Sequence, residues 1–237
     1  MCGRYTLFTP QPTLEERFDA DAESPLEPRY NCAPGQRLPV ITNDAPDTIQ
    51  TLKWGLVPSW ADSESVGNKR INARAETVHE KRSFAEAYEQ RRCLVLADGF
   101  YEWVKQESGK QPYRVAFTDD RPFAMAGLWE RWTPPQTQTG LSDFGGGVAP
   151  DADPEPLETF TVITTEPNGL VSKLHHRMAV VLDESEEETW LTGDADEVQS
   201  LLDPYPDDAM EAYPVSTQVN SPANDGPALI EEVETGV

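Results

Sequence analysis

Apolar residues in this chain gather in short stretches with strand-like spacing, and the few helical patterns are brief. Strands are predicted over residues 2–8, 38–41, 49–54, 93–97, 100–104, 113–117, 123–129, 160–164 and 210–215. Short helices are predicted over residues 14–18, 83–90, 186–191 and 197–202. Strands outnumber helices and most connections are short, so we expect an α+β fold: one curved, mostly antiparallel β-sheet with a barrel-like core and a few short flanking helices.

Two segments fall outside this pattern. Residues 133–157 are rich in Pro, Gly and Asp and have almost no periodic apolar positions, which predicts a disordered loop insertion. Residues 223–237 are expected to be a frayed C-terminal tail. The remainder, residues 1–222, is expected to be a single domain, because 237 residues can bury one sizeable core.

The sequence contains no run of about 18 apolar residues, so no membrane-spanning segment is predicted. The N-terminus lacks the basic start and apolar core of a secretory signal, and we therefore expect a cytoplasmic protein. The three cysteines, Cys2, Cys32 and Cys93, have neither a disulfide-framework spacing nor a Cys-x-x-Cys pair. No metal or other cofactor is expected.

Charge alone argues against a nucleic-acid partner, because 42 acidic and 19 basic residues give a formal net charge of -23 at pH 7. A lysine-poor acidic surface is also typical of proteins that work in concentrated salt, and we interpret the composition as halophilic adaptation. The distribution of charge changes the picture. No Lys or Arg follows Arg177, whereas residues 53–92 hold eight basic and six acidic residues. This stretch could form a face that contacts phosphates.

The second residue offers the clearest candidate chemistry. Removal of Met1 would leave Cys2 with a free α-amine and a thiol on the same carbon skeleton. Their ordinary pKa values are about 7.7 to 8.0 and about 8.5, so both groups can attack one aldehyde. Amine attack gives a Schiff base, and closure by sulfur gives a five-membered thiazolidine. Taken alone, Cys2 could equally fill a space in the core.

Six segments together resemble one known family. They are MCGRY (1–5), RYNCAPG (29–35), WGLVPSW (54–60), INARAET (71–77), RRCLVLADGFYEW (91–103) and LHHRMAVVL (174–182). Their identity and order are similar to those of the SRAP family, abasic-site processing proteins first named SOS response-associated peptidases. The resemblance spans nearly the whole chain and makes residues 1–222 an SRAP-like domain.

The resemblance implies a catalytic set of four residues. Cys2 would be the nucleophile, and Asn72 would hydrogen-bond near the N-terminal amine and the opened sugar. Glu102 would shuttle protons during ring opening and Schiff-base formation, while His175 would act as an acid or base at the sugar oxygen. Considered singly, Glu102 could instead pair with a surface Arg, and His175 could be a core histidine.

The resemblance also implies contacts to DNA. Arg4, Arg74 and Arg177 would bind phosphates beside the abasic sugar, and Trp60 would stack on a neighbouring base unless it is a core aromatic. Asn31 and Pro34 would line the path to Cys2.

Two residues depart from the family pattern or leave its assignment open. Cys32 stands where the family usually has an aliphatic residue, and we expect it to pack in the core. His176 adjoins His175, which leaves open which of the two imidazoles transfers the proton; the motif favours His175.

The implied function is binding of abasic sites in single-stranded DNA and formation of a covalent thiazolidine crosslink that shields the lesion during the DNA damage response. Activity would be of lyase or hydrolase type, the peptidase label would reflect removal of Met1, and the protein would act as a monomer. Two alternatives remain: an N-terminal-nucleophile glutamine amidohydrolase using Cys2, and a noncatalytic module that binds single strands. The first usually needs a second domain, and the second leaves the aminothiol unexplained.

Overall fold

The computed structural model describes residues 2–107, 109–135 and 155–234. Its strands are β1 (Tyr5–Leu7), β2 (Asp21–Ala22), β3 (Arg29–Cys32), β4 (Arg37–Thr42), β5 (Ala45–Trp54), β6 (Asn72–Arg74), β7 (Arg92–Ala97), β8 (Gly99–Gln106), β9 (Gly109–Phe117), β10 (Phe123–Trp132), β11 (Leu157–Thr165), β12 (Met178–Ala179) and β13 (Met210–Pro214). Its α-helices are α1 (Gln11–Phe18), α2 (Ala85–Gln90), α3 (Glu187–Thr192) and α4 (Ala195–Gln199). The predicted strands and helices are therefore confirmed, with small differences at their ends.

A closed ring of strands forms the core. Strands β5, β4, β7, β10 and β11 pair in that order, all antiparallel, and a parallel pairing of β11 with β5 closes the ring. At the closure Phe160 lies opposite Trp54, and their rings stack with centroids 6.1 Å apart. Strand β7 is buried along its whole length. The predicted α+β fold with a curved, mostly antiparallel, barrel-like core is confirmed.

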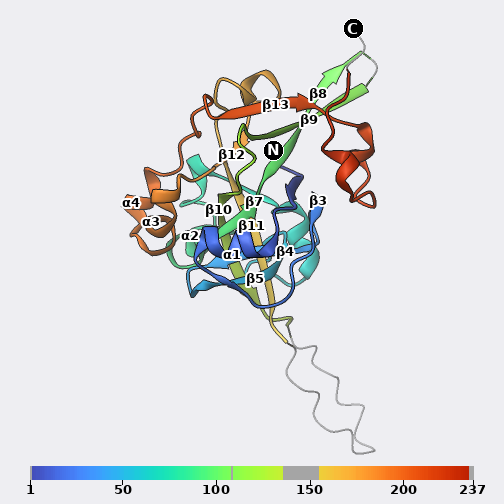
Figure 1. Cartoon of the computed structure of the whole chain (residues 1–237). Coiled ribbons are helices and arrows are strands. Elements are labelled where there is room, and N and C mark those ends of the chain that lie inside the picture. Colours follow the sequence, from blue (N-terminus) through green and yellow to red (C-terminus); the bar gives the residue numbers. More distant parts are fainter. Residues whose placement is uncertain (1, 108, 136–154, 235–237) are drawn as a thin grey trace, which may run out of the picture.

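A second sheet positions the N-terminus. Its strand order is β13-β9-β8-β1-β3, and all the pairings in it are antiparallel. Short β1 lies between β8 and β3, with Tyr5 opposite both Phe100 and Cys32. The β8–β9 hairpin carries the sheet away from the barrel, and its green arrows extend beyond the body in Figure 1. The first residues of the chain are therefore held beside β8.

The short helices lie outside the barrel (Figure 1), with α3 against β7 and α2 against β7 and β10. The predicted insertion at 133–157 joins the antiparallel neighbours β10 and β11, since Trp132 pairs with Leu157. Most of it, residues 136–154, lies outside the described residues. Within the described part of the chain, no helix is long and apolar enough to cross a membrane.

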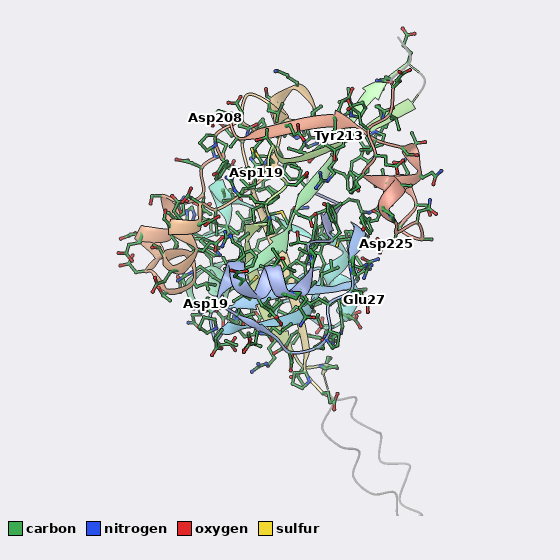
Figure 2. All side chains as sticks on the ribbon, in the orientation of Figure 1. Asp19, Glu27, Asp119, Asp208, Tyr213 and Asp225 are labelled. Carbon is green, nitrogen blue, oxygen red and sulfur yellow. The ribbon has the colours of Figure 1, made fainter. Side chains whose placement is uncertain are left out.

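The expectation of a frayed tail from residue 223 is wrong for residues 223–234. The Asp225 carboxylate accepts hydrogen bonds from the Arg29 side chain and the Tyr30 amide, both at 2.6 Å, and Figure 2 labels Asp225 beside β3. Leu229 is buried, and Val233 donates its amide proton to the Pro214 carbonyl. Hydrogen bonds to β3 and β13 hold the segment in place, and such bonds leave no apolar periodicity in its sequence.

Replacing Asn31 by Ala is expected to loosen this C-terminal segment. Asn31 is fully buried, and its Nδ2 donates to the carbonyls of Val219, Ser221 and Asn224 at 2.8 to 3.2 Å. Loss of the amide removes a donor from each of these carbonyls, although the Val219 carbonyl keeps its bond from Arg4, and the expected cost is about 1–3 kcal/mol. Urea unfolding measures the change, with exposed Asn68→Ala as control; equal stability of both variants would contradict this role.

Candidate active site and nucleic-acid groove

Cys2 is fully buried and lies shortly before β1, which begins at Tyr5. Asn72, the first residue of β6, donates its Nδ2 proton to the Cys2 carbonyl at 2.8 Å. The Oδ1 of Asn72 is buried and accepts no hydrogen bond from any described residue. Burial, followed by the nearby Glu102 charge, raises the pKa of the Cys2 thiol to about 12. The thiol is thus protonated at neutral pH and needs a base before it can attack.

The structure describes four buried acidic residues, Asp98, Glu102, Glu130 and Glu187. Glu102 is 2 % exposed on β8, where the pairing of β8 with β1 brings it beside Cys2. Burial raises the pKa of its carboxyl to about 7. A carboxyl half-protonated at neutral pH can both donate and accept protons.

His175 completes a cluster with Cys2, Asn72 and Glu102, which we call the active-site cluster. It follows the short 3-10 helix η3 (Val171–Lys173), and its Nδ1 lies 4.0 Å from Glu102 Oε1. The amide nitrogen and the carbonyl oxygen of Arg177 lie 3.1 Å and 3.2 Å from that Nδ1. Burial lowers the pKa of His175, so the neutral ring is favoured. His176 packs against it, with ring centroids 4.2 Å apart.

Arg177 is occupied by protein groups. Its guanidinium forms an ion pair with the Glu76 carboxylate and hydrogen bonds to the carbonyl and hydroxyl of Thr164, and the residue is 9 % exposed. Its backbone amide and carbonyl both lie within 3.2 Å of His175 Nδ1. In this arrangement Arg177 positions the loop that carries His175 and His176. Its guanidinium binds Glu76 and Thr164 and is not directed to the phosphate contact expected from sequence.

Arg4 and Asn31 are also bonded within the protein. Arg4 Nη1 donates to Asn31 Oδ1 at 3.2 Å and to the Val219 carbonyl at 2.8 Å, but Arg4 stays half-exposed. Asn31 is fully buried and supports the C-terminal segment, so it does not line an open path. Pro34 is exposed in the turn between β3 and β4. The expected path to Cys2 is therefore not formed by Asn31.

A basic groove lies next to the cluster. It has a volume of about 530 Å³ and is lined by Trp60, Asn72, Arg74, Thr77, Lys81, Arg82, Ser83 and Phe84. Trp60 is 41 % exposed, and the Arg82 guanidinium lies 4.4 Å from its ring centroid. Asn72 lines the groove and also binds Cys2, so the groove reaches the cluster. We name these lining residues the Trp60 groove.

Trp60 and Arg74, both expected at the site from sequence, line the Trp60 groove. Lys81 and Arg82 line it as well, and no contact is predicted for them from sequence, although both fall in the basic stretch 53–92. That local charge balance was the signal that could have identified them. Cys32 is fully buried opposite Tyr5 in the β1–β3 pair, and burial raises the pKa of its thiol. Within the described residues, no group of three His, Cys, Asp or Glu side chains could hold a metal ion.

Comparison with known proteins assigns the family. The family model for SOS response associated peptidase (SRAP) matches residues 1–222. The chain is 43 % identical to abasic site processing protein YoqW of Bacillus subtilis, over 98 % of this chain and 99 % of that protein. It is 34 % identical to abasic site processing protein HMCES of Gallus gallus, over 91 % of this chain and 69 % of that protein.

Solved structures agree. A crystal structure of a protein from Bacteroides thetaiotaomicron superimposes with a TM-score of 0.82 at 30 % identity, covering 98 % of this chain and 100 % of that one. The sequence motifs, the fold and the family model thus lead to one assignment: the chain belongs to the SOS response associated peptidase (SRAP) family.

Proposed function

We propose that this protein processes abasic sites in single-stranded DNA and binds them covalently through Cys2 once Met1 has been removed. The crosslink would shield the lesion during the DNA damage response. The observation that carries the proposal is the cluster of Cys2, Asn72, Glu102 and His175 at the Trp60 groove. YoqW and HMCES, relatives at 43 % and 34 % identity, are named abasic site processing proteins, which supports the substrate class.

The reaction begins with the opened form of the abasic sugar, which presents an aldehyde at C1′. The neutral α-amine of Cys2 adds to that carbon, and the resulting carbinolamine takes up one proton and loses one water to give a protonated Schiff base. The Cys2 sulfur then attacks the same carbon while its proton leaves, and the C=N electron pair returns to nitrogen. The thiazolidine therefore forms with the net loss of one water, and no oxidant or reductant is consumed.

Glu102 supplies the proton transfers. With a pKa of about 7, it can protonate the departing hydroxyl of the carbinolamine and then, as carboxylate, take the proton of the Cys2 thiol. The thiol requires such a base because burial and the Glu102 charge raise its pKa to about 12. Asn72 orients the nucleophile through the Cys2 carbonyl, and its buried Oδ1 can accept a hydrogen bond from the freed amine.

His175 would act at the sugar oxygen. Its Nδ1 faces the Arg177 backbone, so we infer that the ring acts on a substrate oxygen through Nε2. Protonation of the ring oxygen, with loss of the C1′ hydroxyl proton to the Glu102 carboxylate, breaks the bond from C1′ to the ring oxygen and opens the hemiacetal, and the reverse transfers close it. The same group therefore influences both formation and reversal of the crosslink. Arg177 and Glu76 would act as positioning residues for this ring.

The Trp60 groove would hold nucleotides beside the lesion. Arg74, Lys81 and Arg82 are exposed and can contact phosphates, while the exposed Trp60 ring offers a stacking surface. A reversible contact of this kind weakens as salt rises, by an amount that grows with the number of phosphates neutralised. A covalent bond is not lost to screening, so a crosslink through Cys2 suits an acidic protein.

The decisive experiment is incubation of the purified, Met1-processed protein with a single-stranded oligonucleotide that carries one abasic site. We expect an adduct that survives heating in SDS, at low and at high salt, and none with the same oligonucleotide lacking the site. Absence of the adduct at both salt concentrations would refute the proposal. Release of ammonia from glutamine, without any adduct, would establish an amidohydrolase instead.

Replacing Trp60 by Ala is expected to weaken reversible single-strand binding by about 1–3 kcal/mol, because one stacking surface is lost. Fluorescence anisotropy with an unmodified oligonucleotide measures the effect. Trp60→Phe keeps an aromatic face and should retain much of the affinity. Since Trp60 is largely exposed, urea unfolding should change by about 0.5 kcal/mol or less. Unchanged affinity in Trp60→Ala would remove Trp60 from the interface.

A further inference from the structure

One face of the β8–β9 hairpin carries positive charge outside the Trp60 groove. Lys105 lies directly opposite Lys110 in the hairpin, and Trp103 shares that face because it is two residues from Lys105 on β8. Beside them is a hollow of about 330 Å³ lined by Gly3, Arg4, Trp103, Lys110 and Asn220. We name Arg4, Trp103, Lys105, Lys110 and Asn220 the hairpin face.

The pairing of Lys105 with Lys110 is unfavourable in itself. Like charges directly opposite each other in an antiparallel pair destabilise the sheet. The chain has six lysines and a net charge of -23, yet two of these lysines occupy opposing positions, with Arg4 at the same hollow. Both lysines are exposed. An anion bound across them would convert the repulsion into attraction, which indicates an anionic ligand.

Trp103 narrows the class of ligand. Its ring is partly exposed, and its Nε1 donates to Asn220 Oδ1 at 2.7 Å, which fixes the orientation of the indole. An oriented aromatic surface flanked by cations fits a nucleic-acid strand, whose bases stack while its phosphates meet the cations. An acidic peptide would satisfy the charges but has no need of the stacking surface.

Residues of the hairpin face adjoin residues of the active-site cluster in the sequence. Gly3 and Arg4 directly follow Cys2, and Trp103 directly follows Glu102. Neighbouring residues of a strand point to opposite faces, so Trp103 and Glu102 lie on different sides of β8. A strand that reaches both must turn at Gly3. Single-stranded DNA can make this turn, whereas a duplex is stiff over about 150 base pairs.

We propose that the hairpin face is a second single-strand subsite, so that the DNA passes from the Trp60 groove across Cys2 to Trp103, Lys105 and Lys110. Nucleotides on both sides of the lesion are then held, each side by its own aromatic ring and its own cations. This inference rests on the proposed function for the position of the lesion. The affinity of the hairpin face for a single strand does not depend on the covalent chemistry.

Reversible binding is tested first, with an unmodified single-stranded oligonucleotide and fluorescence anisotropy over a range of salt concentrations. The double variant Lys105→Gln/Lys110→Gln should make the negative slope of log affinity against log salt shallower by about 1.4, since two phosphate contacts are lost. Trp103→Ala should weaken binding about tenfold. The matched control is Arg131→Gln, which removes an exposed, ion-paired cation from β10. An unchanged slope in the lysine variant would overturn the subsite.

Adduct formation then locates the subsite relative to Cys2. Three abasic oligonucleotides are compared: one with long flanks on both sides, one without the 5′ flank and one without the 3′ flank. The lysine variant should be slower than the unaltered protein on the first oligonucleotide and on one truncated oligonucleotide, and equal to it on the other. Equal slowing on all three would overturn the assignment. Absence of adduct in the unaltered protein, with the salt effect intact, would refute the proposed function alone.

Discussion

Cys2→Ala is expected to form no adduct that survives heating in SDS, whereas the unaltered protein forms one. Ala is small, so Met1 is still removed and the α-amine is still present. That amine can form only a Schiff base, which water hydrolyses, because no sulfur is available to close the ring. The expected loss is complete under non-reducing conditions. Electrophoresis of the heated reaction mixture measures it.

Borohydride supplies the control for this variant. Reduction converts the Schiff base of Cys2→Ala into a stable amine, so the adduct should reappear only when borohydride is present. Cys2→Ser should behave in the same way, with a hydroxyl that closes the ring far less readily than a thiol. A heat-stable adduct of Cys2→Ala without reduction would show that another residue forms the bond. Lack of a trapped adduct would instead show that the amine does not attack.

Glu102→Gln is expected to slow adduct formation by about 10²-fold or more, because the amide neither donates nor accepts the transferred protons. The pKa of Glu102 is about 7, so steps that need the acid weaken above that pH and steps that need the carboxylate weaken below it. The rate of the unaltered protein should therefore peak near pH 7, and the profile of the variant should be flat there. Rates measured from quenched time courses across pH test this.

The same substitution should increase stability at high pH. Burial raises the carboxyl pKa from 4.5 to about 7, so the unfolded chain releases this proton first as pH rises. Glu102 therefore costs stability progressively between about pH 4.5 and pH 7, up to about 3 kcal/mol above that range. Glu102→Gln lacks this penalty and should unfold at higher urea above pH 7, with no difference below about pH 4. If Glu102→Gln is less active but has the same stability as the unaltered protein at pH 8, Glu102 is not buried in its charged form.

The local pattern of apolar residues was sufficient to locate the strands. Leu38 and Leu52 occupy the apolar positions of their predicted strands and lie opposite each other in the antiparallel β4–β5 pair. The β8–β9 hairpin follows from two strand-like runs around Gly109, whose φ is 138°. These features depend on residues close in sequence, and short apolar runs bounded by turn residues predict them. Closure of the ring through β11 and β5 joins residues more than 100 positions apart, and no local pattern encodes that pairing.

The candidate site also combines features that the sequence predicts with features that only the tertiary structure determines. The chemistry of an aminothiol makes Cys2 a candidate from sequence, the family resemblance implies Asn72, Glu102 and His175, and the basic stretch 53–92 contains the cations that line the Trp60 groove. Only the tertiary structure decided how the polar side chains are used. Arg177 adjoins the histidines in sequence, yet its guanidinium binds Glu76, and Asn31 holds the C-terminal segment. Residue type and spacing determine which groups can react, whereas the partner that a buried polar group satisfies depends on which distant residues the fold brings within hydrogen-bond distance.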